Sequence, residues 1–261
     1  MKLQKSLAVG LFSFGTANAH YLFGRLILDG QWTKTWEYVR EISPEPSLTG
    51  DIALVAPNTN PDSLDLRCGR NASLPISSVK TAVINAGSTV GFATGEPALS
   101  SERPTMYHPG FASAWLSKST TDDLESYAGD GDWFKILSVT GRTEQSLDYS
   151  DPESAPYYDV FKSVWGTYRV GSWNFTIPAT TPSGKYLLRF EHIFPNQVDA
   201  QFYVNCAHVE IVNDGSSGSP GPTVKIPGVY ERGQSDVYFS AYDLNFNITT
   251  FVPPAPIVWE G

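Results

Sequence analysis

The pattern of short apolar runs, each bounded by turn-forming residues, limits most strongly what this chain can fold into. Runs rich in β-branched and aromatic residues recur between clusters of Gly, Pro, Asn and Ser, and no stretch keeps a long helical period. Two long polar segments, 43–63 and 140–155, are typical of loops. The pattern therefore predicts an all-β sandwich with long loops. Strands are expected at Tyr21–Asp29, Thr89–Thr94, Ser113–Lys118, Trp133–Val139, Ser172–Ile177, Lys185–Ile193, Gln201–Val212 and Val237–Ala241.

The first residues have the features of a secretory signal peptide. Lys2 and Lys5 supply positive charge, the segment 7–14 is apolar, and Ala17-Asn18-Ala19 forms an A-x-A cleavage site. The apolar run is too short to span a bilayer. We therefore expect residues 1–19 to be removed and the secreted, extracellular protein to begin at His20.

Charge and length set further limits. The whole chain carries a formal net charge of −9, and removal of the two signal-peptide lysines gives −9 − 2 = −11. Such a surface disfavours nucleic acid and anionic membranes as partners. Although the segment 213–222 is rich in Gly, Ser and Pro, the residues after it have no obvious core of their own. We expect them to wrap back onto a single domain that spans residues 20–261.

The two cysteines and three sequons fit an extracellular protein. Cys68 and Cys206 are expected to form one disulfide, and their wide separation is unlike a zinc motif. Asn71, Asn174 and Asn247 each begin an Asn-x-Ser/Thr sequon and are candidate glycosylation sites.

Two of the four histidines are candidate metal ligands. An N-terminal His20 would offer both its free α-amine and its ring, which together form a chelate. His108 precedes Pro109 and Gly110, and such a turn suits a ligand held on a loop. For His108 taken singly, an ordinary exposed loop residue is the alternative.

Side chains near Cys206 alternate between two faces of a predicted strand. Gln201 and Tyr203 share one face, whereas Phe202, Val204 and Cys206 share the other. We expect the face with the cysteine to be the core face. The opposite face then presents a phenol and a carboxamide together, although a structural Tyr at such a position is also common.

The chain resembles the fungal lytic polysaccharide monooxygenases of auxiliary activity family 9, through matches in order along nearly the whole mature sequence. The matching motifs are His20-Tyr21, His108-Pro109-Gly110, Ser117-Lys118, the segments 131–136 (GDWFKI) and 184–189 (GKYLLR), Gln201-Phe202-Tyr203 with Cys206-Ala207, and Pro227-Gly228-Val229-Tyr230.

The resemblance implies an immunoglobulin-like or fibronectin-III-like β-sandwich that binds one copper ion per chain. It implies nitrogen ligands from His20 and His108, with Tyr203 at a long axial position and Gln201 beside the reacting oxygen. Three nitrogen donors suit copper, the strongest binder among the divalent first-row metals. The implied activity is oxidative cleavage of cellulose or a related β-glucan at C1, C4 or both. It needs O2 or H2O2 and an external electron donor, and we expect a monomer.

Two further histidines leave alternatives open. The family has a histidine beside the copper site, nine residues before the glutamine, and His192 has that spacing from Gln201. However, His192 falls within a predicted strand, so it either fills that catalytic role or is a strand residue beside a shortened loop. His208 shares a face with Cys206, and we expect a buried, hydrogen-bonded residue there rather than a ligand.

The substrate surface and the function class have alternatives as well. Tyr21, Trp32, Trp36, Tyr38 and Tyr230 are candidates for stacking on sugar rings. A glycosidase with two carboxylates is a second class of enzyme, although a solvated acidic surface also explains the many acidic residues. A third possibility is a non-catalytic secreted protein that binds copper or the cell wall on the same fold.

Overall fold

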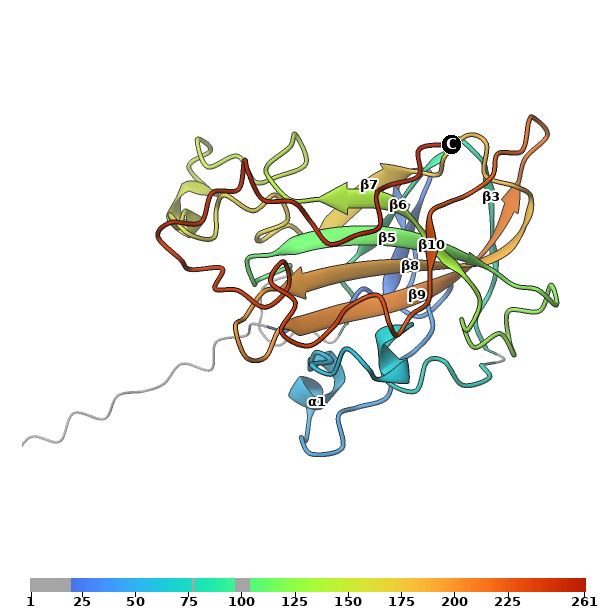
Figure 1. Cartoon of the computed structure of the whole chain (residues 1–261), viewed down its shortest axis with the longest axis horizontal. Coiled ribbons are helices and arrows are strands. Elements are labelled where there is room, and N and C mark those ends of the chain that lie inside the picture. Colours follow the sequence, from blue (N-terminus) through green and yellow to red (C-terminus); the bar gives the residue numbers. More distant parts are fainter. Residues whose placement is uncertain (1–19, 77, 97–103) are drawn as a thin grey trace, which may run out of the picture.

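The structure, a computed structural model, describes residues 20–76, 78–96 and 104–261 and consists mainly of two β-sheets (Figure 1). The predicted signal peptide, 1–19, lies outside these residues. One sheet has four strands in the order β2-β1-β4-β7, and the other has six in the order β10-β6-β5-β8-β9-β3. The strands are β1 Arg25–Leu28, β2 Gln31–Trp32, β3 Ala82–Asn85, β4 Thr89–Ala93, β5 Phe111–Lys118, β6 Trp133–Val139, β7 Ser172–Thr176, β8 Gly184–Phe194, β9 Gln201–Val212 and β10 Thr223–Val224.

Helical structure is confined to short pieces in the described residues. These are α1 Asp51–Val55 and the 3-10 turns η1 Leu64–Leu66 and η2 Ala155–Tyr157. None of the described helices is long and apolar enough to cross a membrane. The prediction of an all-β sandwich with long loops is thus confirmed.

The expected strand at Val237–Ala241 is wrong. The segment forms turns instead, in which the amides of Val237 and Tyr238 both donate to the Gln234 carbonyl. Val237, Tyr238 and Ala241 are nevertheless buried. A loop that is buried against a sheet needs apolar residues just as a strand does, so the two give the same short apolar run in the sequence.

Both faces of the six-stranded sheet are buried. Tyr203 belongs to the cluster between the two sheets, whereas Phe202, Val204 and Cys206 belong to a second cluster, which loops cover. The expectation that only the cysteine face is the core face is therefore wrong. The long loops seen in the sequence provide the additional cover, and they make the sheet the middle layer of the molecule.

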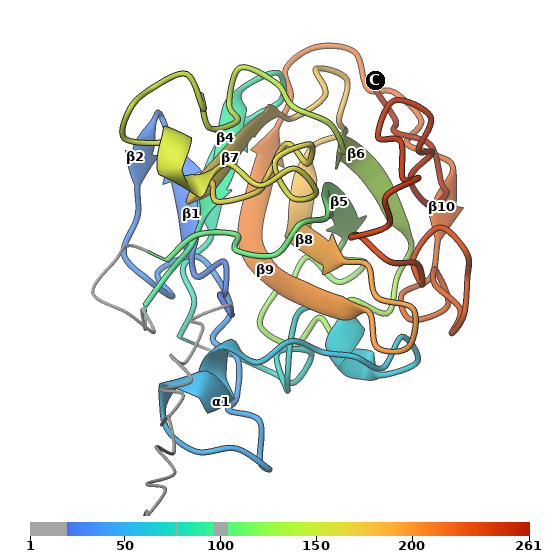
Figure 2. The same cartoon turned by 90° about the vertical axis from the view of Figure 1, so that its left-hand side faces the viewer.

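Two long antiparallel strands determine where the candidate site residues lie. β8 pairs with β9 along its whole length, with His192 opposite Tyr203 and Phe194 opposite Gln201. A six-residue loop, 195–200, joins the strands at the left end of Figure 1. Figure 2 views the molecule from this end, where loops from distant parts of the chain also gather.

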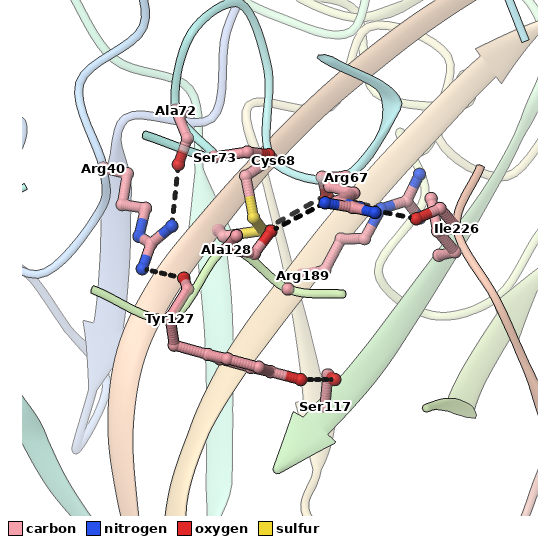
Figure 3. Close-up of a disulfide and its surroundings, with 12 residues drawn as sticks. Arg40, Arg67, Cys68, Ala72, Ser73, Ser117, Tyr127, Ala128, Arg189 and Ile226 are labelled. Carbon is pink, nitrogen blue, oxygen red and sulfur yellow. Dashed lines mark hydrogen bonds between the residues drawn. A yellow bond between two sulfur atoms is a disulfide. The ribbon is translucent and has the colours of Figure 1, made fainter. Parts of the chain in front are cut away.

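The disulfide and two buried arginines attach the long N-terminal loops to the sheet (Figure 3). Cys68 is bonded to Cys206 of β9, which confirms the predicted pairing. Arg189 donates to the carbonyls of Leu66 and Arg67 beside the disulfide. Arg40 donates to the carbonyls of Ala72 and Tyr127. It also donates to the Leu124 carbonyl. Buried guanidinium groups thus satisfy loop carbonyls that water cannot reach.

The C-terminal segment packs on the six-stranded sheet, with Phe251 against the cluster on its outer face and Trp259 against the cluster between the sheets. The Trp259 amide donates to the Lys135 carbonyl, and the Lys135 ammonium donates to the Pro254 carbonyl. Tyr230 donates to the buried carboxylate of Glu191 on β8, at 2.6 Å. The first two bonds hold the tail to β6, and the bond of Tyr230 holds the same C-terminal region to β8, the strand that carries His192.

Candidate metal centre

Three predicted site residues from different parts of the chain meet near the end of the sandwich where the loop 195–200 joins β8 to β9. The rings of His20 and His108 have centroids 5.8 Å apart and stand edge to face. The Tyr203 ring lies 6.3 Å from that of His20 and 6.0 Å from that of His108. His20 comes just before β1, His108 just before β5, and Tyr203 from β9. The fold thus brings together residues that are 88 and 95 positions apart (108 − 20 and 203 − 108).

The unpaired nitrogens of the two histidines fit a metal ion. His20 Nδ1 and His108 Nε2 are buried and have no hydrogen-bond partner. Buried polar atoms are normally paired, so two orphaned acceptors in one place need an explanation. Nδ1 is also the ring atom that can close a six-membered chelate with the α-nitrogen of the same residue. The donor set is therefore the one expected for a copper ligand pair.

Electrostatics keep both imidazoles neutral, as metal binding requires. Burial lowers the pKa of His20 below its ordinary value. Burial, together with the nearby His20 and Lys162, lowers the pKa of His108 to about 3. Neutral rings have a free lone pair at neutral pH. In the described part of the chain, no group of three or more His, Cys, Asp or Glu residues forms a rival metal site.

Tyr203 and Gln201 lie side by side at the start of β9. The Tyr203 hydroxyl donates to Gln201 Oε1 at 2.6 Å. Burial raises the pKa of Tyr203 well above its ordinary value, so the phenol keeps its proton. The alternation argument thus placed these two side chains together correctly, although it did not foresee that Tyr203 is buried.

His192 lies within β8 and not in the loop that follows it. It is fully buried, its Nδ1 is 2.7 Å from the Tyr21 hydroxyl, and its Nε2 is 3.0 Å from Thr167 Oγ1. Burial lowers its pKa to about 3. The position is that of the strand residue we considered, behind Tyr21. A catalytic role for His192 stays a prediction.

His208 is the buried, hydrogen-bonded residue that we expected. Its Nε2 accepts a hydrogen bond from Arg40 Nε at 2.8 Å, next to the carbonyls that the same guanidinium binds. The His208 side chain thus helps to hold Arg40, which binds the N-terminal loops. It lies on the same face of β9 as Cys206.

Sequence reasoning missed several aromatic residues around His108. The Phe194 ring stacks on the His108 ring at 4.5 Å and lies 6.1 Å from the ring of Tyr242. On another side, Tyr107 lies 5.9 Å from His108, and Arg169 bridges Tyr107 and Tyr157. Tyr157 is 38% exposed and Tyr242 is 43% exposed. Phe194 is the last residue of β8, and Tyr107, Tyr157 and Tyr242 lie outside the strands in segments with no periodic pattern, so the sequence alone gave no signal for this group.

Two of the five candidates for sugar stacking are wrong. Tyr21 and Tyr230 are each only 2% exposed, and both hydroxyls are occupied by buried partners. Trp36 and Tyr38 are half-buried. Trp32 is 45% exposed and stays a candidate. The three sequon residues Asn71, Asn174 and Asn247 are all exposed.

Comparison with known proteins gives the family. The sequence model of Auxiliary Activity family 9, formerly GH61, matches residues 20–251. The chain belongs to this family. It is 33% identical to AA9 family lytic polysaccharide monooxygenase U of Thermothielavioides terrestris, with all of both chains covered. It is 34% identical to monooxygenase H of Malbranchea cinnamomea, covering 98% of this chain and all of that one.

Solved structures show the same fold. The crystal structure of HiLPMO9B superposes with a TM-score of 0.66 at 22% identity, covering 93% of this chain and all of that chain. A cellulose-active polysaccharide monooxygenase from M. thermophila gives a TM-score of 0.64 at 20% identity, with the same coverage. The immunoglobulin-like sandwich is therefore confirmed.

Family membership also fixes the broad class of activity. Members of the family are monooxygenases, so the chain is an oxidoreductase that acts on polysaccharide. The alternative of a glycosidase with two carboxylates is not supported.

Proposed function

We propose that the mature protein is a secreted, copper-dependent monooxygenase that cleaves β-1,4-glucan chains such as cellulose. Oxidation at C1, C4 or both would use O2 or H2O2 and an external electron donor. The observation that carries the proposal is the pair of buried, unpartnered nitrogens, His20 Nδ1 and His108 Nε2, next to the Tyr203 ring.

The metal site would be completed by cleavage after Ala19. The backbone nitrogen of His20 then becomes a primary amine, which would join His20 Nδ1 and His108 Nε2 as the third nitrogen donor. Bound copper would supply the one-electron chemistry that activates the oxidant. Phe194 stacks on His108 and fixes the plane of that ring, so the ligand is held before the metal arrives.

Tyr203 and Gln201 would act on the oxygen side of the site. Because Gln201 Oε1 accepts a hydrogen bond from the Tyr203 hydroxyl, the amide N–H groups are the donors that Gln201 would offer to O2 or H2O2. The neutral phenol of Tyr203 would offer a weak oxygen donor to the metal. Both residues thus orient the reactants without changing their own protonation.

The glucan would lie on the exposed aromatic rings around His108. Tyr242 is connected to the candidate ligand His108 through the ring of Phe194. Tyr157 is connected to it through Arg169 and Tyr107. Aromatic faces pack well against the C–H faces of sugar rings. A monomer with one catalytic domain, residues 20–261, would present this surface to the substrate. The surface charge disfavours a nucleic acid or a membrane as partner.

The test is copper-loaded mature protein, assayed on cellulose with and without added reductant. We expect aldonic or 4-keto sugar ends that depend on the reductant, and a copper(II) spin-resonance spectrum that changes in His108→Ala. His208→Gln is the matched control, because it removes a buried imidazole away from the site and should leave the spectrum unchanged. Tight copper binding without any cleavage would favour the non-catalytic copper-binding alternative.

A further inference from the structure

Arg169 carries a positive charge that pairs with no acidic side chain in the described part of the chain. It makes only one polar contact through its guanidinium, from Nε to the Tyr168 hydroxyl at 3.4 Å. In every other described arginine the guanidinium contacts a carbonyl or carboxylate oxygen; these are Arg25, Arg40, Arg67, Arg70, Arg142, Arg189 and Arg232. Nη1 and Nη2 of Arg169 are not buried either. They can therefore bind a group from outside the chain.

Arg169 lies beside the candidate metal centre. Its guanidinium carbon is 5.1 Å from the centroid of the Tyr107 ring, and that ring is 5.9 Å from the ring of His108. The backbone fixes the same relationship. The Arg169 amide donates to the Met106 carbonyl at 2.7 Å, and the Met106 amide donates to the Val170 carbonyl at 3.0 Å. Because Met106 comes just before Tyr107 and His108, a ligand on Arg169 would lie next to the candidate copper ligand.

The Arg169 side chain is held in place before any ligand binds. Its guanidinium carbon is 4.3 Å from the centroid of the Tyr157 ring and 6.0 Å from that of the Tyr168 ring. Planar guanidinium groups pack on aromatic rings in this way. The backbone of Arg169 has a φ of +59°, a strained value for a residue other than glycine, which persists only where the surrounding contacts impose it. A guanidinium that is already fixed loses less conformational freedom on binding.

The geometry of a guanidinium selects the kind of anion. Two parallel N–H groups of an arginine match the two oxygens of a planar carboxylate. In a polysaccharide, the group with this chemistry is the C6 carboxylate of a uronic acid unit. A sugar ring that packs on Tyr157, which is 38% exposed, would bring such a carboxylate within reach of the neighbouring guanidinium.

The rest of the chain makes an unpaired cation at this place unusual. The formal net charge is −9 and becomes −9 − 2 = −11 without the expected signal peptide. Lys162 also acts electrostatically on His108, but its ammonium is paired with Asp159 at 3.3 Å. An acidic glycan would be repelled by such a protein over most of its surface. Arg169 gives the surface around His108 a direct partner for a carboxylate.

We propose that Arg169 binds the carboxylate of a glucuronate unit, so that the glucan taken by this protein carries uronic acid units. Nη1 and Nη2 donate to the two carboxylate oxygens, and the ring of the same sugar packs on Tyr157. The neighbouring units of the glycan then lie over Tyr107, toward His108. For the glucan chain the inference rests on the proposed function, whereas the carboxylate contact itself does not.

The first experiment compares binding of the mature protein to unmodified cellulose and to cellulose oxidised at C6 to glucuronate. No reductant or peroxide is added, so binding alone is measured. We expect Arg169→Gln to lower the ratio of carboxylated to unmodified binding by roughly five-fold, the upper end for an exposed ion pair. High salt should weaken the native preference, as for any exposed ion pair. An unchanged ratio in Arg169→Gln would overturn the inference.

Arg142→Gln is the matched control for the loss of one positive charge. Arg142 also packs on a tyrosine, with its guanidinium carbon 4.6 Å from the centroid of the Tyr149 ring. Its Nη2, however, already donates to the Leu147 carbonyl at 2.6 Å. We expect this variant to keep the native ratio. Arg169→Lys retains the charge but not the paired N–H groups, so its ratio should fall between those of the native protein and Arg169→Gln.

The second experiment needs no variant that could fail to fold. The mature protein, labelled with nitrogen-15 in arginine and kept free of metal, is titrated with a disaccharide of glucuronate β-1,4-linked to glucose. Cellobiose is the control for the neutral sugar, and acetate is the control for a free carboxylate. We expect the Nε–H signal of Arg169 to shift with the acidic disaccharide at lower concentration than with acetate, and to shift little with cellobiose.

This titration separates the inference from the proposed function, because it needs neither copper nor cleavage. If the copper-loaded protein cleaves no glucan but Arg169 still responds to the acidic disaccharide, the proposed function fails and the carboxylate contact stands. An Arg169 signal that the acidic disaccharide does not move would contradict the inference. So would a shift that acetate produces at the same concentration, since Arg169 would then bind any free carboxylate equally well.

Discussion

The Tyr203 hydroxyl donates a 2.6 Å hydrogen bond to Gln201 Oε1, so one side chain of the candidate metal centre fixes the orientation of another. Tyr203→Phe removes this bond but keeps the ring that stacks on Tyr21. We expect the variant to retain copper and to lose roughly 10- to 100-fold in turnover, as is usual when a group that orients a metal site is removed. Isothermal titration with copper and product analysis measure the two effects. Loss of copper binding would mean that Tyr203 holds the metal more directly than proposed.

The exposed ring of Tyr242 predicts an effect on substrate binding. Tyr242→Ala should weaken binding to cellulose by about 1 kcal/mol, or roughly five-fold, because one aromatic face for sugar stacking is lost. Copper affinity should not change, since Tyr242 reaches His108 only through Phe194. Tyr158→Ala is a useful comparison, because Tyr158 is also exposed but packs on Tyr149. Equal cellulose binding by the native protein and Tyr242→Ala would show that the Tyr242 ring does not contact cellulose.

Buried His208 predicts a loss of stability in acid. Burial, with Arg40 beside it, lowers the folded pKa of His208 to about 3, below its ordinary value of 6.5. The contribution of neutral His208 is therefore complete above about pH 6.5 and falls as the pH drops toward about 3, because only the unfolded state then takes up the proton. The expected slope is about 1.4 kcal/mol per pH unit in the free energy of unfolding.

His208→Gln isolates that contribution. A Gln oxygen can still accept from Arg40 Nε, but it does not titrate. Urea unfolding between pH 7 and pH 4 should give a shallower pH dependence for this variant than for the native protein. Identical slopes for the two proteins would contradict the assignment.

The disulfide predicts a large loss of stability on its removal. Cys68 and Cys206 are 138 positions apart, so the bond closes a long loop in the unfolded chain. The double variant Cys68→Ala, Cys206→Ala should lose about 4–5 kcal/mol in the chain-entropy model. Chemical unfolding measures the change. An unchanged midpoint would show that the contacts of Arg40 and Arg189 alone hold the N-terminal loops.

Much of the fold could be predicted from local sequence. Trp133–Val139 and Gln201–Val212 begin and end as strands at the expected residues, because each is a long run of β-forming residues bounded by turn formers. The strand β3 was missed, since Ala82–Asn85 is short and depends on parallel pairing with distant β9. Pairing of that kind leaves no local pattern.

In the candidate site, too, some residues could be predicted from the sequence and others could not. The donor residues His20 and His108 follow from chemistry and motif, because few side chains can serve as copper ligands. The place of His192 does not. The place of the His192 side chain depends on whether β8 ends before it or continues to Phe194. Its contacts with Tyr21 and Thr167, which lie far away in the sequence, form only when the chain has folded. The aromatic surface of Tyr157 and Tyr242 likewise depends on how irregular loops fold.

The central claim is that the α-amine of His20 is one of three nitrogen ligands of a copper ion. The most direct test compares copper binding by the protein that begins at His20 with binding by the same protein carrying one additional Gly before it. We expect tight binding and a three-nitrogen copper(II) spin-resonance spectrum for the first protein, and loss of both for the second. Equal affinity and identical spectra for the two proteins would contradict it.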